Sequence, residues 1–180
     1  MPTAFIAHGI YGNPEENWFP WLKTKLETEG WTVHVPHFPT KDDLKPEDWW
    51  EALQPYEEYL DAETTLIGHS LGAAFLLKVI EKYPVSSTFF VAPAWGVTGN
   101  EFDPVMGPIA DQEFDWELIG KNCPSFTILH SDNDPYIPLA QAETLAKNLH
   151  TEVQLIEGAG HFNESAGYME FPLLLKQLTH

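Results

Sequence analysis

The stretch Thr64-Thr65-Leu66-Ile67-Gly68-His69-Ser70-Leu71-Gly72-Ala73-Ala74 says most about the fold. Its first four residues are β-branched or apolar and predict a buried strand, and residues 71–83 have the composition of a helix. The pattern Gly-x-Ser-x-Gly lies between the two. In a strand–turn–helix unit this pattern places the serine on a sharp, strained turn, with its hydroxyl above the edge of the sheet. We therefore interpret Ser70 as a nucleophile.

The neighbours of Ser70 have physical reasons to be small. Gly68 and Gly72 let strand and helix pass closely where a Cβ would clash, and the two alanines that follow keep the first helical turn slim. The turn also places the Leu71 N–H at the start of the helix. Main-chain donors and the helix dipole there favour a developing oxyanion. Leu71 is therefore the first candidate donor of an oxyanion hole.

Outward from this stretch, β-like runs alternate with helix-like segments, which predicts a parallel sheet covered by helices on both faces, a three-layer α/β sandwich. The runs are 3–8, 31–35, 64–67, 86–91, 125–130 and 152–156. The first helical segment follows Pro14 and Pro20, carries Trp18, Leu22 and Leu26 on one face and ends at Gly30. The others are a stretch opening at Pro46 that Pro55 breaks or restarts, 71–83, 139–149 and 164–178. Residues 92–124 are rich in Gly, Pro and Asp and predict a long loop, helical only over 115–119. We expect a single domain over residues 1–180.

A serine hydroxyl needs a base to take its proton, and the base needs a carboxylate to orient it. In a sheet of this kind the acid and then the histidine follow the serine, each on a loop after a late strand. Asp132 and Asp134 follow the run 125–130, and His161 stands on a Gly-rich loop after the run 152–156. His161 is therefore the candidate base, and the two aspartates are rival candidates for the acid.

Other histidines have weaker claims to the role of base. His69 is adjacent to Ser70 in the turn, where neighbouring side chains point apart, and His8 is expected to shape the loop after the first strand. His34 and His37 lack a third ligand at a spacing typical of metal sites. We therefore expect no metal, and the chemistry requires no organic cofactor.

The chain resembles the α/β-hydrolases, and more closely the compact retinoblastoma-binding type of serine hydrolase with its bacterial relatives. The resemblance covers nearly the whole chain, through His8-Gly9 and residues 68–72, 131–138 and 160–162. In that family the acid stands immediately before Pro in an Asp-Pro-aromatic-aliphatic-Pro run. The resemblance therefore implies that Asp134 is the acid, with Asp132 as the alternative.

The resemblance also implies a second oxyanion donor in the loop after the first strand. By similarity to His-Gly loops of the α/β-hydrolases this donor is the Ile10 N–H, with Tyr11 as the alternative. A mostly parallel six-stranded sheet of order 2-1-3-4-5-6 makes the first and third strands neighbours at the point where such sheets bind ligands. We therefore expect this loop and the turn at Ser70 to face each other.

The expected activity is hydrolysis of an uncharged ester with a small or medium acyl group, through an acyl-enzyme. Candidate pocket residues are Tyr11, Trp95, Phe102, Tyr136 and Phe162, and only the loop around 95–115 is available to cover the site. Amide or thioester cleavage would use the same residues, and a hydroxynitrile lyase can retain them. A protein-binding module on a hydrolase scaffold is the alternative from another class.

The charge composition limits the classes of molecule that the protein is expected to bind. The sequence has 9 cationic residues, all lysines, and 27 acidic residues, which gives a formal net charge of −18. An acidic chain without arginine repels phosphate backbones and anionic lipid, so nucleic acid and membrane partners are not expected. Cys123 is the single cysteine, which suits a reducing compartment, and no run reaches membrane-spanning length. We expect a cytoplasmic protein acting on a small-molecule ester, with a protein partner left open.

Overall fold

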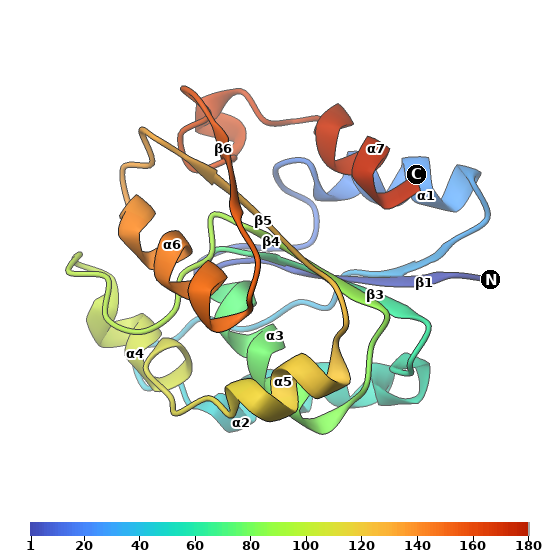
Figure 1. Ribbon diagram of the computed structural model, residues 1–180, viewed down its shortest axis with the longest axis horizontal. Coiled ribbons are helices and arrows are strands. Elements are labelled where there is room, and N and C mark those ends of the chain that lie inside the picture. The colour runs from blue at the N-terminus through green and yellow to red at the C-terminus, as the bar shows by residue number, and fades with distance from the viewer. Residues whose placement is uncertain (180) are drawn as a thin grey trace.

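The computed structural model describes residues 1–179 and is built around a six-stranded sheet, shown in Figure 1. The strands are β1 (Thr3–Ala7), β2 (Thr32–His34), β3 (Thr64–His69), β4 (Ser87–Val91), β5 (Phe126–Ser131) and β6 (Val153–Ile156). Their order is β2-β1-β3-β4-β5-β6, and every neighbouring pair is parallel. The predicted strand order is confirmed, and the sheet is parallel throughout rather than mostly parallel.

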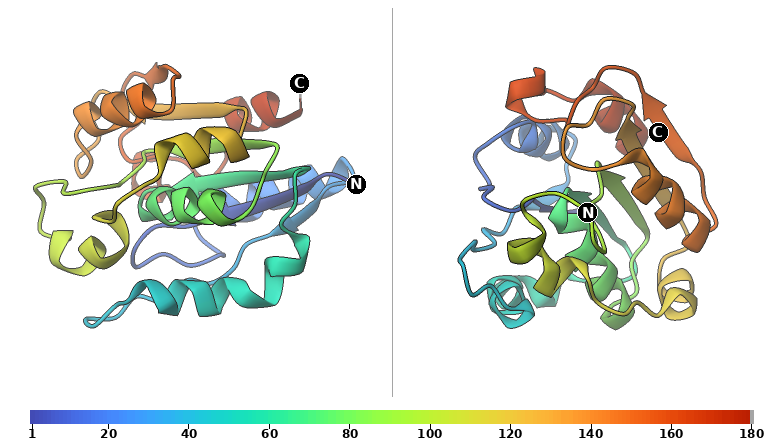
Figure 2. Two further views of the ribbon diagram at one scale, coloured as in Figure 1. Left: turned by 60° about the horizontal axis from the view of Figure 1, so that its bottom comes forward. Right: turned by 90° about the vertical axis from the view of Figure 1, so that its left-hand side faces the viewer.

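Helices cover both faces of the sheet, as the views in Figures 1 and 2 show. The α-helices are α1 (Phe19–Thr28), α2 (Pro46–Leu53), α3 (Leu71–Lys82), α4 (Asp103–Ala110), α5 (Trp116–Asn122), α6 (Leu139–Asn148) and α7 (Pro172–Thr179). Two 3₁₀ segments are η1 (Gln54–Tyr59) and η2 (Glu164–Ala166). Helices α1 and α7 pack on one face, and α2 to α6 contribute side chains to the core on the other.

The two faces of the sheet carry separate apolar cores. Successive residues of β3, Leu66 and Ile67, are both fully buried but belong to opposite cores, because side chains alternate along a strand. The inner strands β1, β3, β4 and β5 are therefore buried along most of their length, which made them recognisable in the sequence, whereas the edge strand β6 exposes Gln154 and Leu155.

Two helical segments differ from the sequence prediction. The single helix expected over 164–178 is wrong, because the chain leaves η2 at Gly167 in the left-handed region (φ 85°) and starts again as α7 at Pro172. The expected loop 92–124 contains α4, whose first residue, Asp103, accepts hydrogen bonds from the Thr98 and Gly99 amides (3.0 and 2.7 Å). Gly107 and Pro108 lie inside α4 and are poor helix formers, so the composition of this segment did not predict a helix.

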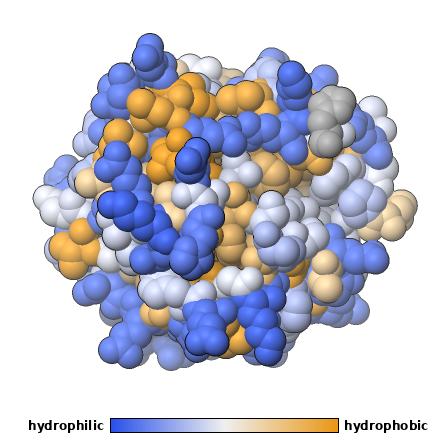
Figure 3. All heavy atoms as spheres, viewed as in Figure 1, coloured by the Kyte–Doolittle hydropathy of each residue, from blue (hydrophilic) through white to orange (hydrophobic). Residues whose placement is uncertain are grey.

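The surface is largely hydrophilic on the face seen in Figure 1. Figure 3 shows hydrophilic residues spread over the face seen in Figure 1, with apolar residues gathered in smaller groups. Within residues 1–179, no helix has the length and apolar character needed to span a bilayer.

Gly72 allows α3 to approach β1. A Cβ at this position would lie 2.2 Å from the Ala7 carbonyl oxygen, and no rotation of a side chain can relieve a contact with main chain. We expect Gly72→Ala to lower the free energy of unfolding by about 3 kcal/mol or more, measured by urea unfolding. Gly120→Ala, on an exposed part of α5 with no atom near its hypothetical Cβ, is the matched control and should be neutral or stabilising by up to about 1 kcal/mol. Equal stability of Gly72→Ala and wild type would contradict the close approach.

Candidate active site

Ser70 lies on a strained turn between β3 and α3. Its φ of 53° and ψ of −125° fall in a region that non-glycine residues rarely adopt. Main-chain hydrogen bonds hold the turn: the Ser70 amide donates to the Val91 carbonyl, and the Ser70 carbonyl accepts from the Ala73 and Ala94 amides, each at 3.0 Å. The surrounding strand ends therefore stabilise the turn that the Gly-x-Ser-x-Gly pattern predicts.

The loop after β1 and the turn at Ser70 are in contact, as expected from the pairing of β1 with β3. A Cβ at Gly9 would lie 2.8 Å from the Ser70 Cβ. The Tyr11 amide donates to Thr40 Oγ1 at 2.8 Å, so it is not available to a ligand. Within residues 1–179, neither the Ile10 amide nor the Leu71 amide donates to a protein acceptor. Of the two candidates in this loop, the structure therefore leaves Ile10 with a free donor.

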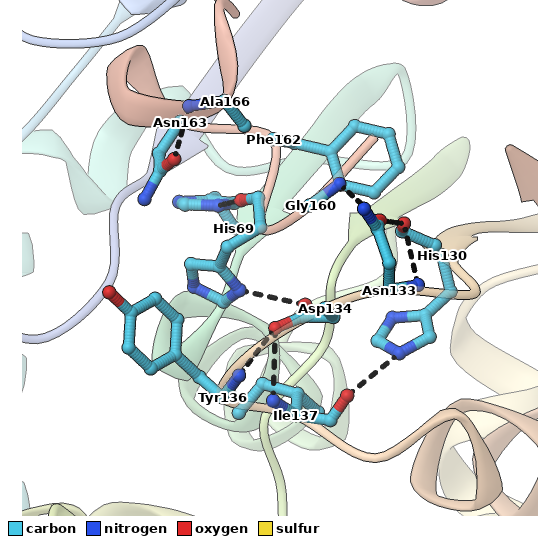
Figure 4. A network of polar contacts seen from close by, with 12 residues as sticks. His69, His130, Asn133, Asp134, Tyr136, Ile137, Gly160, Phe162, Asn163 and Ala166 are labelled. Atoms are coloured by element: carbon cyan, nitrogen blue, oxygen red, sulfur yellow. Dashed lines mark hydrogen bonds and ion pairs between the residues drawn. The ribbon is translucent and has the colours of Figure 1, made fainter. Parts of the chain in front are cut away.

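His161 and Asp134 are brought together from the loops after β6 and β5. His161 Nδ1 donates to Asp134 Oδ2 at 2.8 Å, and Asp134 Oδ1 accepts from the Tyr136 and Ile137 amides at 2.8 and 3.0 Å, the contacts drawn around Asp134 in Figure 4. Burial by itself raises the pKa of Asp134, but the hydrogen bonds from His161 and these two amides outweigh it and hold the pKa below its ordinary value. Asp134 is therefore a carboxylate that can only accept, so His161 Nδ1 carries the hydrogen of the bond between them.

Asp132, the rival candidate, has a different place. Its Oδ1 accepts from the Gly158 amide at 2.7 Å, and it therefore ties the loop after β5 to the loop that precedes His161. Asp134 is the aspartate that contacts the His161 imidazole.

Three further histidines lie near this site, and all are buried: His8, His69 and His130, of which His130 Nε2 donates to the Ile137 carbonyl at 3.1 Å. His8 Nδ1 donates to the Gly9 carbonyl at 2.8 Å and its Nε2 accepts from the Phe38 amide at 3.0 Å, so it shapes the loop after β1. His69 Nε2 donates to the His161 carbonyl at 2.8 Å. Burial lowers the pKa of His8 to about 4 and that of His69 to about 3. Across residues 1–179, no three His, Cys, Asp or Glu side chains gather in a group suited to a metal ion.

These depressed pKa values predict acid sensitivity. His8 and His69 stay neutral in the folded protein, whereas in the unfolded chain they take up protons below a pH of about 6.5. The unfolded state is therefore stabilised relative to the folded state as pH falls. We expect the free energy of unfolding to drop by roughly 1.5 kcal/mol per histidine between pH 6.5 and pH 5, before most carboxylates titrate. Urea unfolding at several pH values measures this slope, and His8→Gln should flatten it. A stability that is constant over this interval would contradict the prediction.

A cavity of about 490 Å³ opens beside Ser70 and His161. Its wall includes three of the five aromatic residues expected there, Tyr11, Phe102 and Tyr136, whose rings follow one another at centroid distances of 6.2 and 5.9 Å. The wall also includes residues that the sequence did not single out: Glu16, Asn17, Asn100, Met106, Ile137, Asn163, Glu164 and Ser165. Residues 16–17 and 163–165 lie a few positions after the loops predicted to carry the oxyanion donor and His161. This closeness in sequence was the available indication that they line the cavity.

The other two expected pocket residues do not line the cavity. Trp95 packs against Trp116 at a ring distance of 5.3 Å, and its indole N–H donates to the Gln141 carbonyl at 3.1 Å. Phe162 has a positive φ of 50°, and its fully buried ring stacks on Phe171 in the core beneath the loop. The contact with the Trp116 indole directs the Trp95 ring away from Ser70, and the turn of the main chain does the same for the Phe162 ring.

Comparisons with known proteins show the family and the fold of the chain. The chain is 26% identical over 182 residues to serine hydrolase RBBP9 of Rattus norvegicus, covering 99% of this chain and 97% of that one. The crystal structure of the ydeN gene product of Bacillus subtilis matches with a TM-score of 0.91 at 23% identity, covering 99% and 97% of the two chains. Est1E of Butyrivibrio proteoclasticus, solved with ferulic acid bound, matches with a TM-score of 0.71 at 17% identity, covering 100% of this chain and 90% of that one.

The structural matches identify the α/β-hydrolase fold. The profile of the serine hydrolase family matches residues 4–180, nearly the whole sequence. By this match the chain belongs to the serine hydrolase family.

Proposed function

We propose that the protein is a carboxylesterase-like serine hydrolase in which Ser70, His161 and Asp134 form a catalytic triad. The observation that carries the proposal is the 2.8 Å hydrogen bond from His161 Nδ1 to Asp134, made at a cavity whose wall also contains Ser70. The bond directs the proton to Nδ1 and leaves the Nε2 lone pair for the serine hydroxyl.

The reaction follows from these positions. Ser70 Oγ attacks the ester carbonyl carbon while His161 Nε2 takes the hydroxyl proton, and the Ile10 and Leu71 amides donate to the oxyanion. The tetrahedral intermediate collapses, the bond to the alcohol breaks, and His161 returns its proton to the leaving oxygen. A water molecule then attacks the acyl-enzyme while His161 Nε2 takes its proton. The second intermediate collapses, the bond to Ser70 Oγ breaks, His161 returns the proton to Ser70, and the acid leaves. Asp134 stabilises the imidazolium that forms in each half-reaction.

The cavity favours an uncharged acyl group of small or medium size. One part of its wall is apolar, with Phe102, Met106 and Ile137, and its volume is about 490 Å³. The carboxylates Glu16 and Glu164 stand on another part, and within residues 1–179 no lysine lines the cavity. Burial and the nearby Glu164 both act to raise the pKa of Glu16 above its ordinary value. An acyl group that carries a carboxylate would therefore meet like charge.

A panel of p-nitrophenyl esters tests this proposal. We expect turnover of the acetate, butyrate and octanoate, and a strong decrease with the palmitate, which exceeds the cavity. The hemisuccinate, close in length to the butyrate but anionic, should react about tenfold more slowly or worse, because repulsion by the two carboxylates is of the order of 1 kcal/mol or more. Glu164→Gln should narrow that difference. No turnover of any ester by the folded protein would contradict the proposal.

A further inference from the structure

The loop that carries His161 is bound to the rest of the fold residue by residue. Three consecutive residues each make a hydrogen bond to a different segment: Gly160 N–H to Asn133 Oδ1 (2.7 Å), His69 Nε2–H to the His161 carbonyl (2.8 Å), and Trp18 Nε1–H to the Phe162 carbonyl (3.0 Å). The first two are visible among the dashed lines of Figure 4. Phe162 has a φ of 50°, which non-glycine residues rarely adopt, so the loop is held in a conformation that needs such support.

The bond from His69 differs from the other two because His69 is covalently attached to Ser70. One peptide link and one hydrogen bond therefore connect the nucleophile to the main chain of the base. Within residues 1–179, no hydrogen bond joins Ser70 Oγ to His161 directly. The contact of His69 is thus the shortest polar connection between the turn and the loop.

The surroundings of His69 fix both its ring and its proton. The ring is 4% exposed and lies against the edges or faces of Trp18, Phe19 and His161, at centroid distances of 6.1, 5.8 and 4.8 Å. A carbonyl can only accept, so Nε2 carries the hydrogen of the ring. The titratable groups that act on His69 are His161, Asp134 and His8, and burial is the main reason for its low pKa of about 3. The ring therefore stays neutral at working pH and adds no positive charge beside the imidazolium of His161.

We propose that His69 is a positioning residue, whose Nε2–H bond to the main-chain carbonyl of His161 fixes the imidazole of His161 relative to Ser70. The inference rests on the proposed function, because it assigns His161 the role of base. His69 also lines the cavity, but its Nε2–H is engaged by the His161 carbonyl, so we assign its effect to the place it gives to His161. Displacement of a catalytic group by about 1 Å can lower a rate by about 100-fold, so a main-chain anchor at the base has a large effect.

Three variants test the hydrogen bond itself. His69→Gln keeps an N–H donor, the same number of bonds from Cβ as Nε2, whereas His69→Leu fills similar space without a donor. Trp18→Phe removes a hydrogen bond from the next carbonyl of the loop and controls for general loosening. We expect kcat for p-nitrophenyl butyrate to fall about tenfold or more in His69→Leu, with KM within about twofold, and to stay within about threefold of wild type in His69→Gln and Trp18→Phe. Rates are compared per folded molecule, from urea unfolding of each variant.

A readout without turnover separates this inference from the proposed function. The Nδ1 proton of His161, hydrogen-bonded to Asp134, should give a downfield resonance in the proton NMR spectrum of wild type, His69→Gln and Trp18→Phe. It should broaden or shift in His69→Leu, even if no ester proves to be a substrate. Equal kcat and an unchanged resonance in His69→Leu would overturn the inference. So would equal losses in His69→Leu and His69→Gln, since the donor would then not be the feature that matters. If His69→Leu does not fold, a loss in His69→Gln as large as that of Ser70→Ala would also overturn it.

Discussion

Ser70→Ala should abolish ester hydrolysis, lowering kcat for p-nitrophenyl butyrate by roughly 10⁵-fold or more. Loss of the nucleophile removes the acyl-enzyme route, and only the oxyanion donors and binding remain to accelerate direct attack by water. The backbone at position 70 stays in place through its hydrogen bonds to Val91, Ala73 and Ala94, none of which involves the hydroxyl. A steady-state assay with active enzyme standards measures the effect.

Ser165→Ala is the matched control for this loss. Ser165 lines the same cavity, and its hydroxyl donates to Asn163 Oδ1 at 2.8 Å rather than to the acid–base pair. Its rate should remain within about threefold of wild type, because surface substitutions of this kind remove no transition-state contact. A Ser70→Ala variant with a tenth of wild-type activity, free of contaminating enzyme, would rule out Ser70 as the nucleophile.

Asp134→Asn should lower kcat by about 10⁴-fold with little change in fold. An amide at this position no longer selects the His161 tautomer with its proton on Nδ1, and it cannot stabilise the imidazolium. The Tyr136 and Ile137 amides can still donate to the remaining side-chain oxygen, so the loop keeps its hydrogen bonds. The measurement is kcat and KM over pH 5 to 9, together with the unfolding midpoint.

Asp132→Asn provides the comparison on the same loop. Its side-chain oxygen can still accept from the Gly158 amide, and among the described residues 1–179 the aspartate hydrogen-bonded to the His161 ring is Asp134. We expect its rate to stay within about tenfold of wild type. A greater loss of kcat in Asp132→Asn than in Asp134→Asn would show that Asp134 is not the acid of the triad.

The parts of the fold that depend on regular periodicity could be predicted from the sequence. Buried parallel strands are rich in apolar and β-branched residues, and the small residues around Ser70 have a single geometric purpose, so the strands and the turn followed from local patterns. The strand order came with the resemblance to the α/β-hydrolases. The choice of the acid between Asp132 and Asp134 could not be made from local patterns. Both stand on the same loop, and only the direction of the chain between them decides which one meets His161 and which one meets Gly158.

The positions of individual side chains could not be predicted, because they depend on local turns. Phe162 is adjacent to His161, but a positive φ sends its ring into the core instead of the cavity. Trp95 is held away from the cavity by its contacts with Trp116 and the Gln141 carbonyl. His69 binds a carbonyl 92 residues further along the chain, and no local pattern encodes such a contact.

Labelling with a fluorophosphonate probe, followed by peptide mass spectrometry, tests most directly whether Ser70 is an activated nucleophile. We expect covalent modification of Ser70 in the wild-type protein, none in Ser70→Ala, and labelling slowed by several orders of magnitude in His161→Ala, because the serine then has no base. Folded wild-type protein that stays unlabelled, or that carries the label on another residue, would contradict the account.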